Sequence, residues 1–459
     1  MDNPFRHKSG LRPRFTPSQV LVSGFAALIL VGTFLLWLPI SAEPGHRTSF
    51  IDALFTATSA VCVTGLVVVD TAQHFSAFGE AVVLLLIQAG GLGIMTLSAL
   101  MLLLMGKRVS LRDRLLMQEA LGSFSIAGVV RLTRNIIVVS LAIEGTGALL
   151  LAARWALDHP LGKSLYWGVF HSVSAFNNAG FDITSASLRE YNRDPVILLV
   201  ISSLIILGGI GFLILEDVWR HRRWAKLSLH SRLALKITGL LLVVGTLFVL
   251  AMEYTNPATL GGMPWYHKIF NAYFSAVTPR TAGFESVLTG AMRDATLFFT
   301  IILMFIGASP GGTGGGIKTT TFAMIALTIR STVTGKDHVE VMGRRLPAEL
   351  VDKAIAVTAI AMGLIVVAGG LLLVTEARSL ADPKSGVTFL KLIFEDISAF
   401  GTVGLSTGIT PDLSHLGKII ITLTMYVGRV GPLTMAVALA QRKYVRNPVY
   451  YPEDRVMIG

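Results

Sequence analysis

The chain has 459 residues, of which 53% are hydrophobic and only 15% are charged. Its mean hydropathy of +0.65 lies far above that of a soluble domain. These values exclude an ordinary soluble protein and indicate an integral membrane protein. The formal charge of +11 does not call for a nucleic-acid partner, because basic loops facing the anionic membrane lipids of the inner leaflet account for it.

A helix needs about 20 predominantly apolar residues to cross a bilayer. Eight apolar stretches are predicted to do so: 17–39, 80–105, 131–153, 195–219, 234–252, 294–330, 354–375 and 416–440. The first follows a basic lead and shows no small-residue cleavage site after a short apolar core, so we expect it to be retained as a span.

Lys and Arg residues gather in segments that fall between alternate spans. These segments are 6–14, 106–114 with 131–134, 219–232, 329–345 and 441–446. Short loops rich in Lys and Arg stay on the cytoplasmic side. We therefore expect a multi-pass protein of the cell membrane with both termini in the cytoplasm.

Four related segments precede a glycine at the same spacing. They read FTATSAVCVTG, FHSVSAFNNAG, YFSAVTPRTAG and FEDISAFGTVG, and they end at Gly65, Gly180, Gly283 and Gly404. Each opens on an aromatic residue and is too short to cross the membrane, but long enough for a helix that enters and stops. The repeat predicts four re-entrant half-helices, each followed by a loop.

A second motif lies inside the span that follows each of these glycines. The four copies are GGLG at 90–93, GGIG at 208–211, GGTG at 311–314 and GRVG at 428–431. We therefore predict an all-α integral membrane protein with four pseudo-symmetric helix–pore-helix–helix repeats around a central ion pore. The predicted units, with their filter segments, are 1–115 (61–66), 116–230 (176–181), 231–345 (279–284) and 346–459 (400–405).

The four loops suggest the chemistry of a cation filter. Irregular backbone in hydrocarbon is tolerated only where it is buried in protein or lines an aqueous pathway. Carbonyl oxygens suit a dehydrated monovalent cation, glycine permits positive φ, and the C-terminal ends of half-helices attract cations. The loops carry no carboxylate at their narrowest point, which argues against a divalent site. We expect Arg280 to anchor its loop from behind, through a carboxylate or carbonyl oxygens.

The third unit contains the sequence GASPGGTGGGIKTTT from Gly307. A helix cannot continue through it, because glycine costs about 1 kcal/mol and proline about 3 kcal/mol relative to alanine. We interpret 307–318 as a gate loop below the filter, while a kink without gating stays open. A nucleotide phosphate loop is disfavoured because Ile317, and not glycine, precedes Lys318. The predicted gate residues are Gly311, Gly312, Thr313, Gly314, Gly315, Gly316 and Lys318.

Arg429 replaces a glycine of the second motif in the fourth unit. An arginine within a span costs at least a few kcal/mol and normally faces a cavity or a partner. We predict a pore constriction at Arg429. Two roles stay open, a fixed charge that opposes cation dwell and a tether that holds the gate loop through its carbonyl oxygens.

Taken as a set, the four filter loops, SPGGTGGGIKTTT and GRVGP resemble the Trk/Ktr/HKT superfamily of potassium transporters over essentially the whole chain. With eight spans the chain is most similar to the KtrB type of membrane subunit. The resemblance implies a potassium pathway, a homodimer with one pore in each protomer, and a cytosolic KtrA-type ring that binds ATP or ADP and moves the gate. It also implies a sodium requirement for rapid uptake in many members.

The resemblance assigns ion-binding backbone carbonyls to three residues in each loop, with potassium as the bound ion and sodium as a second candidate. These residues are Val63, Thr64, Gly65, Asn178, Ala179, Gly180, Thr281, Ala282, Gly283, Thr402, Val403 and Gly404. It places the gate at 311–318 and the constriction at Arg429. Glycine in all four filters implies a preference for potassium over sodium.

The sequence disfavours two other classes of function. A secondary transporter is expected to show two inverted halves with paired broken helices, whereas only one span is predicted to break here, which favours a pore. A sodium-coupled carrier remains the alternative. An intramembrane enzyme needs convergent ionisable residues, which are scarce, so no enzyme is expected. The single cysteine, Cys62, excludes an intramolecular disulfide.

Overall fold

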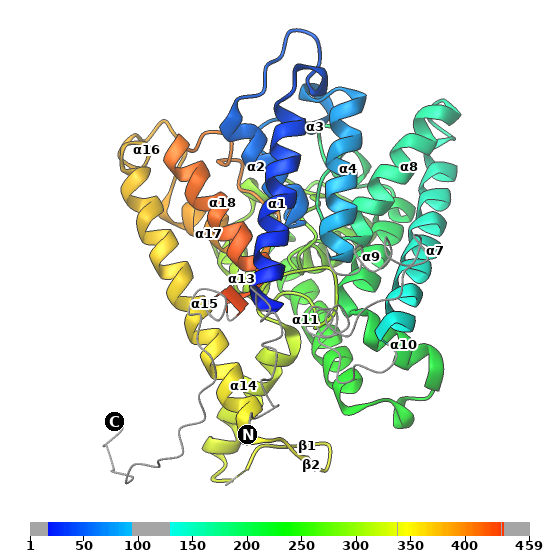
Figure 1. The fold of residues 1–459 in the computed structure, drawn as a ribbon, viewed down its shortest axis with the longest axis vertical. Coiled ribbons are helices and arrows are strands. Elements are labelled where there is room, and N and C mark those ends of the chain that lie inside the picture. The colour runs from blue at the N-terminus through cyan, green and yellow to red at the C-terminus, as the bar shows by residue number, and fades with distance from the viewer. Residues whose placement is uncertain (1–16, 94–128, 337, 433, 436–459) are drawn as a thin grey trace, which may run out of the picture.

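The computed structural model describes residues 17–93, 129–336, 338–432 and 434–435. The basic segments predicted at 6–14, 106–114 and 441–446 lie outside these residues. The described chain is built almost entirely from helices, grouped in four consecutive units (Figure 1). The first unit contains α1 (Pro17–Trp37), α2 (Phe50–Val61), the short α3 (Thr71–His74) and α4 (Ala77–Leu92).

The other units repeat the order of span, half-helix and span. The second contains α7 (Val129–Trp155), α8 (Leu161–Phe176), α9 (Pro195–Ile210) and α10 (Phe212–His221). The third contains α11 (Leu229–Glu253), α12 (Trp265–Val277), α13 (Asp294–Phe305) and α14 (Thr319–Val333). The fourth contains α15 (Ala348–Thr375), α16 (Ala377–Ala381), α17 (Phe389–Gly401) and α18 (His415–Val430).

Side-chain caps fix where many of these helices begin. The Ser49 hydroxyl accepts from the Asp52 backbone N–H at the start of α2, and the Ser76 hydroxyl accepts from the Gly79 N–H at the start of α4. Asp194 caps α9, which opens on a proline whose fixed φ suits the first helical turn. The half-helices α8 and α12 instead begin directly after a proline, without a side-chain cap. The C-terminal ends of all four half-helices lead directly into the glycine loops.

The half-helices α2, α8, α12 and α17 have 12, 16, 13 and 13 residues, so none is long enough to cross a bilayer. Among the described residues, four helices are long and apolar enough to span a membrane by themselves, namely those at 18–37, 133–155, 229–253 and 348–375. The helices α9 and α10 pass the same test only when they are counted together, and they are bent at 97°. All eight predicted spans contain helix among the described residues, and the helix is interrupted within 195–219 and within 294–330.

The prediction that only one span breaks was wrong. The axes of α9 and α10 meet at 97° across Gly211, which has φ +99°. In the first and fourth units α4 and α18 also end at the last glycine of the second motif, with φ +83° at Gly93 and +93° at Gly431. In the third unit α13 already ends at Phe305, ahead of GGTG. Glycine adopts positive φ without a Cβ clash, so it ends a helix wherever neighbours stabilise the break.

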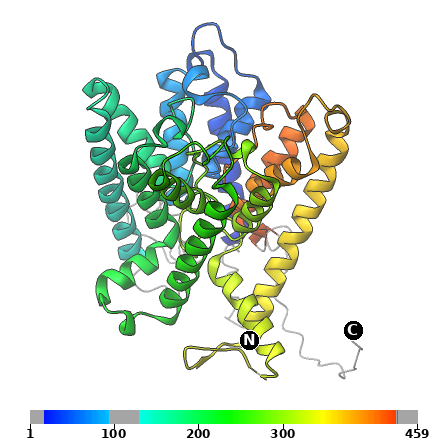
Figure 2. The same cartoon turned by 180° about the vertical axis from the view of Figure 1, so that it is seen from behind.

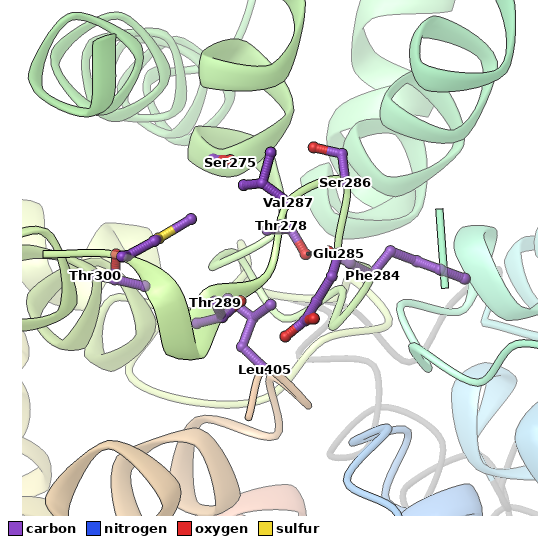
Figure 3. Close-up of a pocket in the computed structure, with 10 residues that line it drawn as sticks. Ser275, Thr278, Phe284, Glu285, Ser286, Val287, Thr289, Thr300 and Leu405 are labelled. Carbon is purple, nitrogen blue, oxygen red and sulfur yellow. Dashed lines mark hydrogen bonds between the residues drawn. The ribbon is translucent and has the colours of Figure 1, made fainter. Parts of the chain in front are cut away.

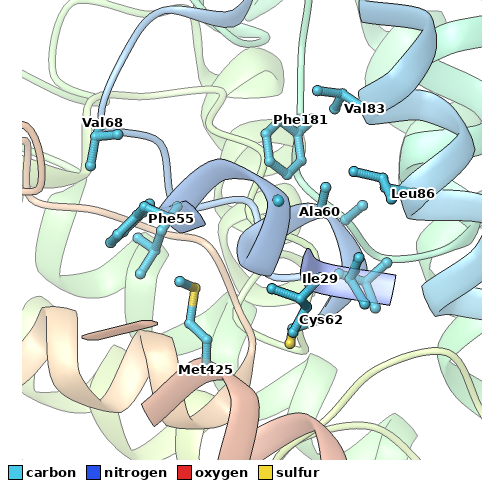
Figure 4. Packing of buried hydrophobic residues seen from close by; sticks show 14 of the residues in the cluster. Ile29, Phe55, Ala60, Cys62, Val68, Val83, Leu86, Phe181 and Met425 are labelled. Carbon is cyan, nitrogen blue, oxygen red and sulfur yellow. The ribbon is translucent and has the colours of Figure 1, made fainter. Parts of the chain in front are cut away.

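The four units pack around a common centre. One core cluster joins Cys62 and Phe55 of the first unit to Phe181 from the second and Met425 from α18 (Figure 4). Seen from behind, α11 and α12 cover the opposite side (Figure 2). The antiparallel hairpin of β1 (Glu340–Val341) and β2 (Arg344–Arg345) lies at the same end of the molecule as the turn between α10 and α11 (Figures 1 and 2).

Candidate functional site

The four glycine loops meet in a closed cycle at the centre of the molecule. A methyl group placed on Gly65 would lie 2.9 Å from the Cα atom of Gly180, and one placed on Gly180 would lie 3.0 Å from that of Gly283. The corresponding distances are 3.2 Å from Gly283 to Gly404 and 3.0 Å from Gly404 to Gly65. No side chain fits at any of the four positions, so each unit is held in place by its neighbours.

The same backbone conformation recurs in all four loops. The ring glycines have φ values of +93°, +69°, +77° and +88° in chain order. Two residues earlier the chain is also left-handed, with φ of +51° at Val63, +59° at Asn178, +71° at Thr281 and +49° at Thr402. Left-handed φ costs roughly 1 to 2 kcal/mol for a residue with a Cβ atom, so packing must enforce it. Sequence reasoning expected positive φ only at the glycines.

Backbone carbonyl groups lie beside this ring. The oxygen of Ala179 would lie 2.5 Å from a methyl group on Gly65, that of Ala282 2.8 Å from one on Gly180, and that of Val403 2.7 Å from one on Gly283. The Thr64 oxygen closes the cycle against Gly404. In a regular strand successive peptide groups alternate in direction, and positive φ breaks that alternation. The ring therefore brings oxygens from all four units together.

A hydroxyl group near the end of each half-helix holds its loop. Ser59 accepts from the Gly65 N–H at 3.0 Å, and Ser398 accepts from the Gly404 N–H at 3.1 Å. Ser174 and Thr278 instead donate to the carbonyls of the residues after their ring glycines, both at 2.7 Å. These residues were not predicted. The signal was present, because a Ser or Thr stands five or six positions before each glycine.

The intramembrane loop lies against the second and fourth units. A hydrogen bond from the Gly307 N–H to the Ile317 carbonyl, at 2.9 Å, joins the two ends of this loop. The Thr313 hydroxyl donates to the carbonyl of Phe176 at the end of α8, at 3.2 Å. The Gly315 N–H donates to the Thr402 hydroxyl of the fourth glycine loop, at 3.1 Å. These bonds position the predicted gate residues directly against the glycine loops.

Arg429 connects the same loop to two other units. Its guanidinium donates to the Thr313 carbonyl of the intramembrane loop and to the Gly90 carbonyl at the end of α4, the latter at 2.5 Å. Lys318 adds a bond from its ammonium group to the Gly314 carbonyl, at 2.7 Å. Two cationic side chains therefore lie at the loop, both bonded to its backbone.

Arg280 lies outside the ring, behind the third loop. Its guanidinium reaches the Thr238 carbonyl of α11 at 3.4 Å, and no carboxylate pairs with it among the described residues. This contact agrees with the expectation that Arg280 anchors its loop through a carbonyl oxygen.

A small cavity with a mixed polar and apolar lining lies beside the third loop. It is lined by Ser275, Thr278, Ser286 and Thr289 of the third unit and by Leu405 of the fourth. Glu285, two residues after a ring glycine, also lines it, and its carboxylate points toward Leu405 and Thr289 (Figure 3). Sequence reasoning did not single out Glu285. In the parts of the chain that the structure covers, no three His, Cys, Asp or Glu side chains are placed to hold a metal ion.

Comparisons with known proteins identify the family. A family model described as "TrkH: Cation transport protein" matches residues 4–447. The chain is 43% identical over 446 residues to the Ktr system potassium uptake protein B of Bacillus subtilis, covering 97% of each chain. It is 39% identical over 454 residues to the potassium/sodium uptake protein NtpJ of Enterococcus hirae, covering 98% of this chain and 99% of that one.

The fold has a counterpart among solved structures. The potassium transporter TrkH of Vibrio parahaemolyticus superposes with a TM-score of 0.73, covering 95% of this chain and 86% of that chain at 20% sequence identity. This likeness confirms the predicted all-helical membrane fold. Together with a family match over nearly the whole length, it leads to one conclusion: the chain belongs to the TrkH family of cation transport proteins.

Proposed function

We propose that this chain conducts potassium across the cell membrane through the ring of its four glycine loops. The observation that carries the proposal is the closed cycle of Gly65, Gly180, Gly283 and Gly404, in which four units contribute the same backbone conformation to one centre. The names of the relatives support potassium as the ion, since all three that are described above are named for potassium uptake or transport.

The proposed filter works through backbone oxygens. Dehydrating a monovalent cation is compensated where several carbonyl oxygens replace its water, and the C-terminal ends of the half-helices add a favourable potential. The twelve residues predicted from the sequence supply three successive carbonyls from each unit. Their burial among neighbouring loops keeps the oxygens in place, so little reorganisation accompanies ion entry.

The intramembrane loop is the proposed gate. It is bonded to Phe176, Thr402 and Arg429, which belong to two other units, so opening requires that these bonds break together. The bonds of Arg429 to two carbonyls support the tether role for this residue. Its charge beside the pathway also opposes cation dwell, so we propose that both roles contribute.

The cytoplasmic end is the proposed site of regulation. α14 begins directly after the loop and leads to the β1–β2 hairpin, so a force on the hairpin reaches the gate through one helix. We propose that the chain forms a homodimer and that a cytosolic nucleotide-binding ring acts on this end. The relative in Bacillus subtilis is named as part of a Ktr system, which supports partner subunits.

A sodium-coupled carrier is the second candidate. The name of the Enterococcus relative includes sodium, and the break between α9 and α10 removes the argument that only one span is interrupted. A carrier would saturate at low turnover and require both ions together. A pore would pass potassium down its gradient without sodium.

Growth rescue tests the proposal. The intact chain, supplied with a cytosolic partner subunit, is expected to restore growth of a potassium-uptake-deficient bacterium on limiting potassium, whereas Gly404→Asp is expected to fail. Tracer flux in liposomes with and without sodium then separates pore from carrier. Equal rescue by the Gly404→Asp variant would refute conduction through the ring.

A further inference from the structure

The turn between α10 and α11 has features that ion conduction does not use. We define the elbow as residues 212–232, which comprise α10, the short helix at Trp224–Lys226 and the start of α11. α10 leaves the direction of α9 at 97°, so it runs across the spans and not along them. It lies toward the end of the molecule that also holds the β1–β2 hairpin (Figure 1). A helix in this orientation at the end of a span lies along the membrane surface.

The inner side of the elbow is firmly held. Ile214 is fully buried against the protein. Asp217 accepts from the Ser231 hydroxyl at 2.5 Å and from the Ser228 N–H at 3.0 Å, and it pairs with His221 at 2.7 Å. The elbow is therefore a rigid support whose own carboxylate is already occupied.

The outer side of the elbow is apolar and exposed. Trp219 is 77% exposed, Trp224 is 48% exposed and Val218 is also uncovered. Tryptophan has an amphipathic ring that favours the boundary between headgroups and acyl chains, where it is enriched in membrane proteins. Lipid contact accounts for side chains that would otherwise be exposed to water.

The elbow also carries excess positive charge. Arg220, Arg222, Arg223 and Lys226 are exposed, and none forms an ion pair with a described residue. The Arg222 guanidinium lies 5.4 Å from the centre of the Trp219 ring, which links the charged and aromatic groups. Glu216 is the other carboxylate of the elbow and offsets one charge. Arginine presents several donors that match a phosphate group.

We infer that the elbow is a binding site for the anionic phosphodiester headgroup of an inner-leaflet lipid. The four cations would hold the phosphate, and the two tryptophans would lie at the headgroup boundary beside α9. An acidic soluble protein would match the charges, but it would not account for two exposed tryptophans at the end of a span. The inference does not depend on which ion the chain conducts.

Lipid retention by the full-length protein tests the site. The purified chain is titrated with dioleoyl phosphatidylglycerol or dioleoyl phosphatidylcholine, and native mass spectrometry counts the lipids that stay bound. The test variant is R220Q/R222Q/R223Q/K226Q. The matched control, R330Q/K336Q/R344Q/R345Q, removes four charges near the hairpin at the same end of the molecule. A third variant, R220K/R222K/R223K, keeps the charge and shows that substitution in the elbow does not unfold it.

The wild-type chain is expected to retain phosphatidylglycerol in preference to phosphatidylcholine. In the test variant the ratio of bound phosphatidylglycerol to bound phosphatidylcholine is expected to fall at least about tenfold. The hairpin control is expected to stay within about twofold, and the lysine variant to bind measurably. Equal losses in the elbow and hairpin variants would mean unspecific attraction and would overturn the inference. Displacement of the lipid by an equal concentration of inorganic phosphate would overturn it too, in favour of a soluble anion. The inference would also be overturned if the elbow variant bound lipid as the wild type does but no longer captured an acidic cytosolic protein.

Discussion

The glycine loops and the spans that follow them both recur four times in the chain, yet only the loops keep one conformation. The four loops read CVTG, NNAG, RTAG and GTVG, and all four share the same two left-handed positions. The second spans carry one motif near their ends but adopt three arrangements there: a helix end at Gly93 and Gly431, a 97° bend at Gly211 and a long loop after Phe305.

The difference follows from how each region is supported. Every ring glycine touches two neighbouring loops, so a change in one unit is resisted by the others. The ends of the second spans do not share one set of neighbours. A methyl group on Gly428 would meet the Phe400 oxygen of its own unit, whereas one on Gly312 would lie 2.7 Å from the Gly209 oxygen of the second unit. Contacts among all four units therefore hold the ring, and the region below the ring differs from unit to unit.

The largest expected effect comes from adding one methyl group to the ring. Gly404→Ala would place a Cβ atom 3.0 Å from the Cα atom of Gly65, at φ +88°, so we expect potassium uptake to fall by at least about tenfold. Gly370→Ala on α15 is the control, because its added methyl group meets nothing within 4 Å and alanine favours the helix by about 1 kcal/mol. Normal uptake by Gly404→Ala would show that the ring is not the pathway.

Substitutions of Arg429 address the region below the ring. Arg429→Gln replaces the charge-assisted bonds to the carbonyls of Thr313 and Gly90 with at most one neutral bond; a net loss of about 1.5 kcal/mol corresponds to roughly tenfold greater basal flux in liposomes. Arg429→Lys keeps the charge but cannot span both carbonyls. If the tether dominates, the lysine variant leaks like the glutamine variant. Wild-type flux in the lysine variant would make the charge the dominant barrier.

A smaller effect is expected at Thr402, which joins the two regions. Thr402→Val keeps the shape but leaves the Gly315 N–H without its acceptor, so we expect about fivefold greater basal flux, equivalent to a net hydrogen bond of about 1 kcal/mol. Thr56→Val in α2 is the matched control, since the buried Thr56 hydroxyl has no hydrogen-bond partner among the described residues and lies outside the proposed filter. The tracer flux through the control variant should equal that of the wild type. Equal leakage in both variants would contradict the proposed contact.

The smallest expected effect lies in the elbow, outside both regions. Asp217→Asn removes the charge that accepts from Ser231 and Ser228 and pairs with His221, so we expect the melting temperature of the purified protein to fall by about 1 to 3 °C. Glu216→Gln is the control, and its melting temperature should match that of the wild type. Equal melting temperatures for all three proteins would remove the role assigned to Asp217.

Sequence reasoning singled out the segments that the structure brings together, and it missed the conformations that contacts between units decide. The four loops, the intramembrane loop and Arg429 were found from glycine, proline and charge patterns that carry a local cost in a membrane. The left-handed conformations at Val63 and Thr402 were missed, because nothing local favours them in valine or threonine. Family membership confirms the expectations of a transport protein and of a chain that is not an enzyme.

The amino-acid sequence by itself determined that this is a helical membrane protein with four repeats, because apolar length, basic loops and a recurring half-helix follow from solvation alone. Only the tertiary structure decided that the four glycines close into one ring, that three second spans end or bend at their last glycine, and that Arg429 bonds Thr313 and Gly90. These features arise between residues far apart in the chain, where close packing and the need to satisfy buried carbonyls act together.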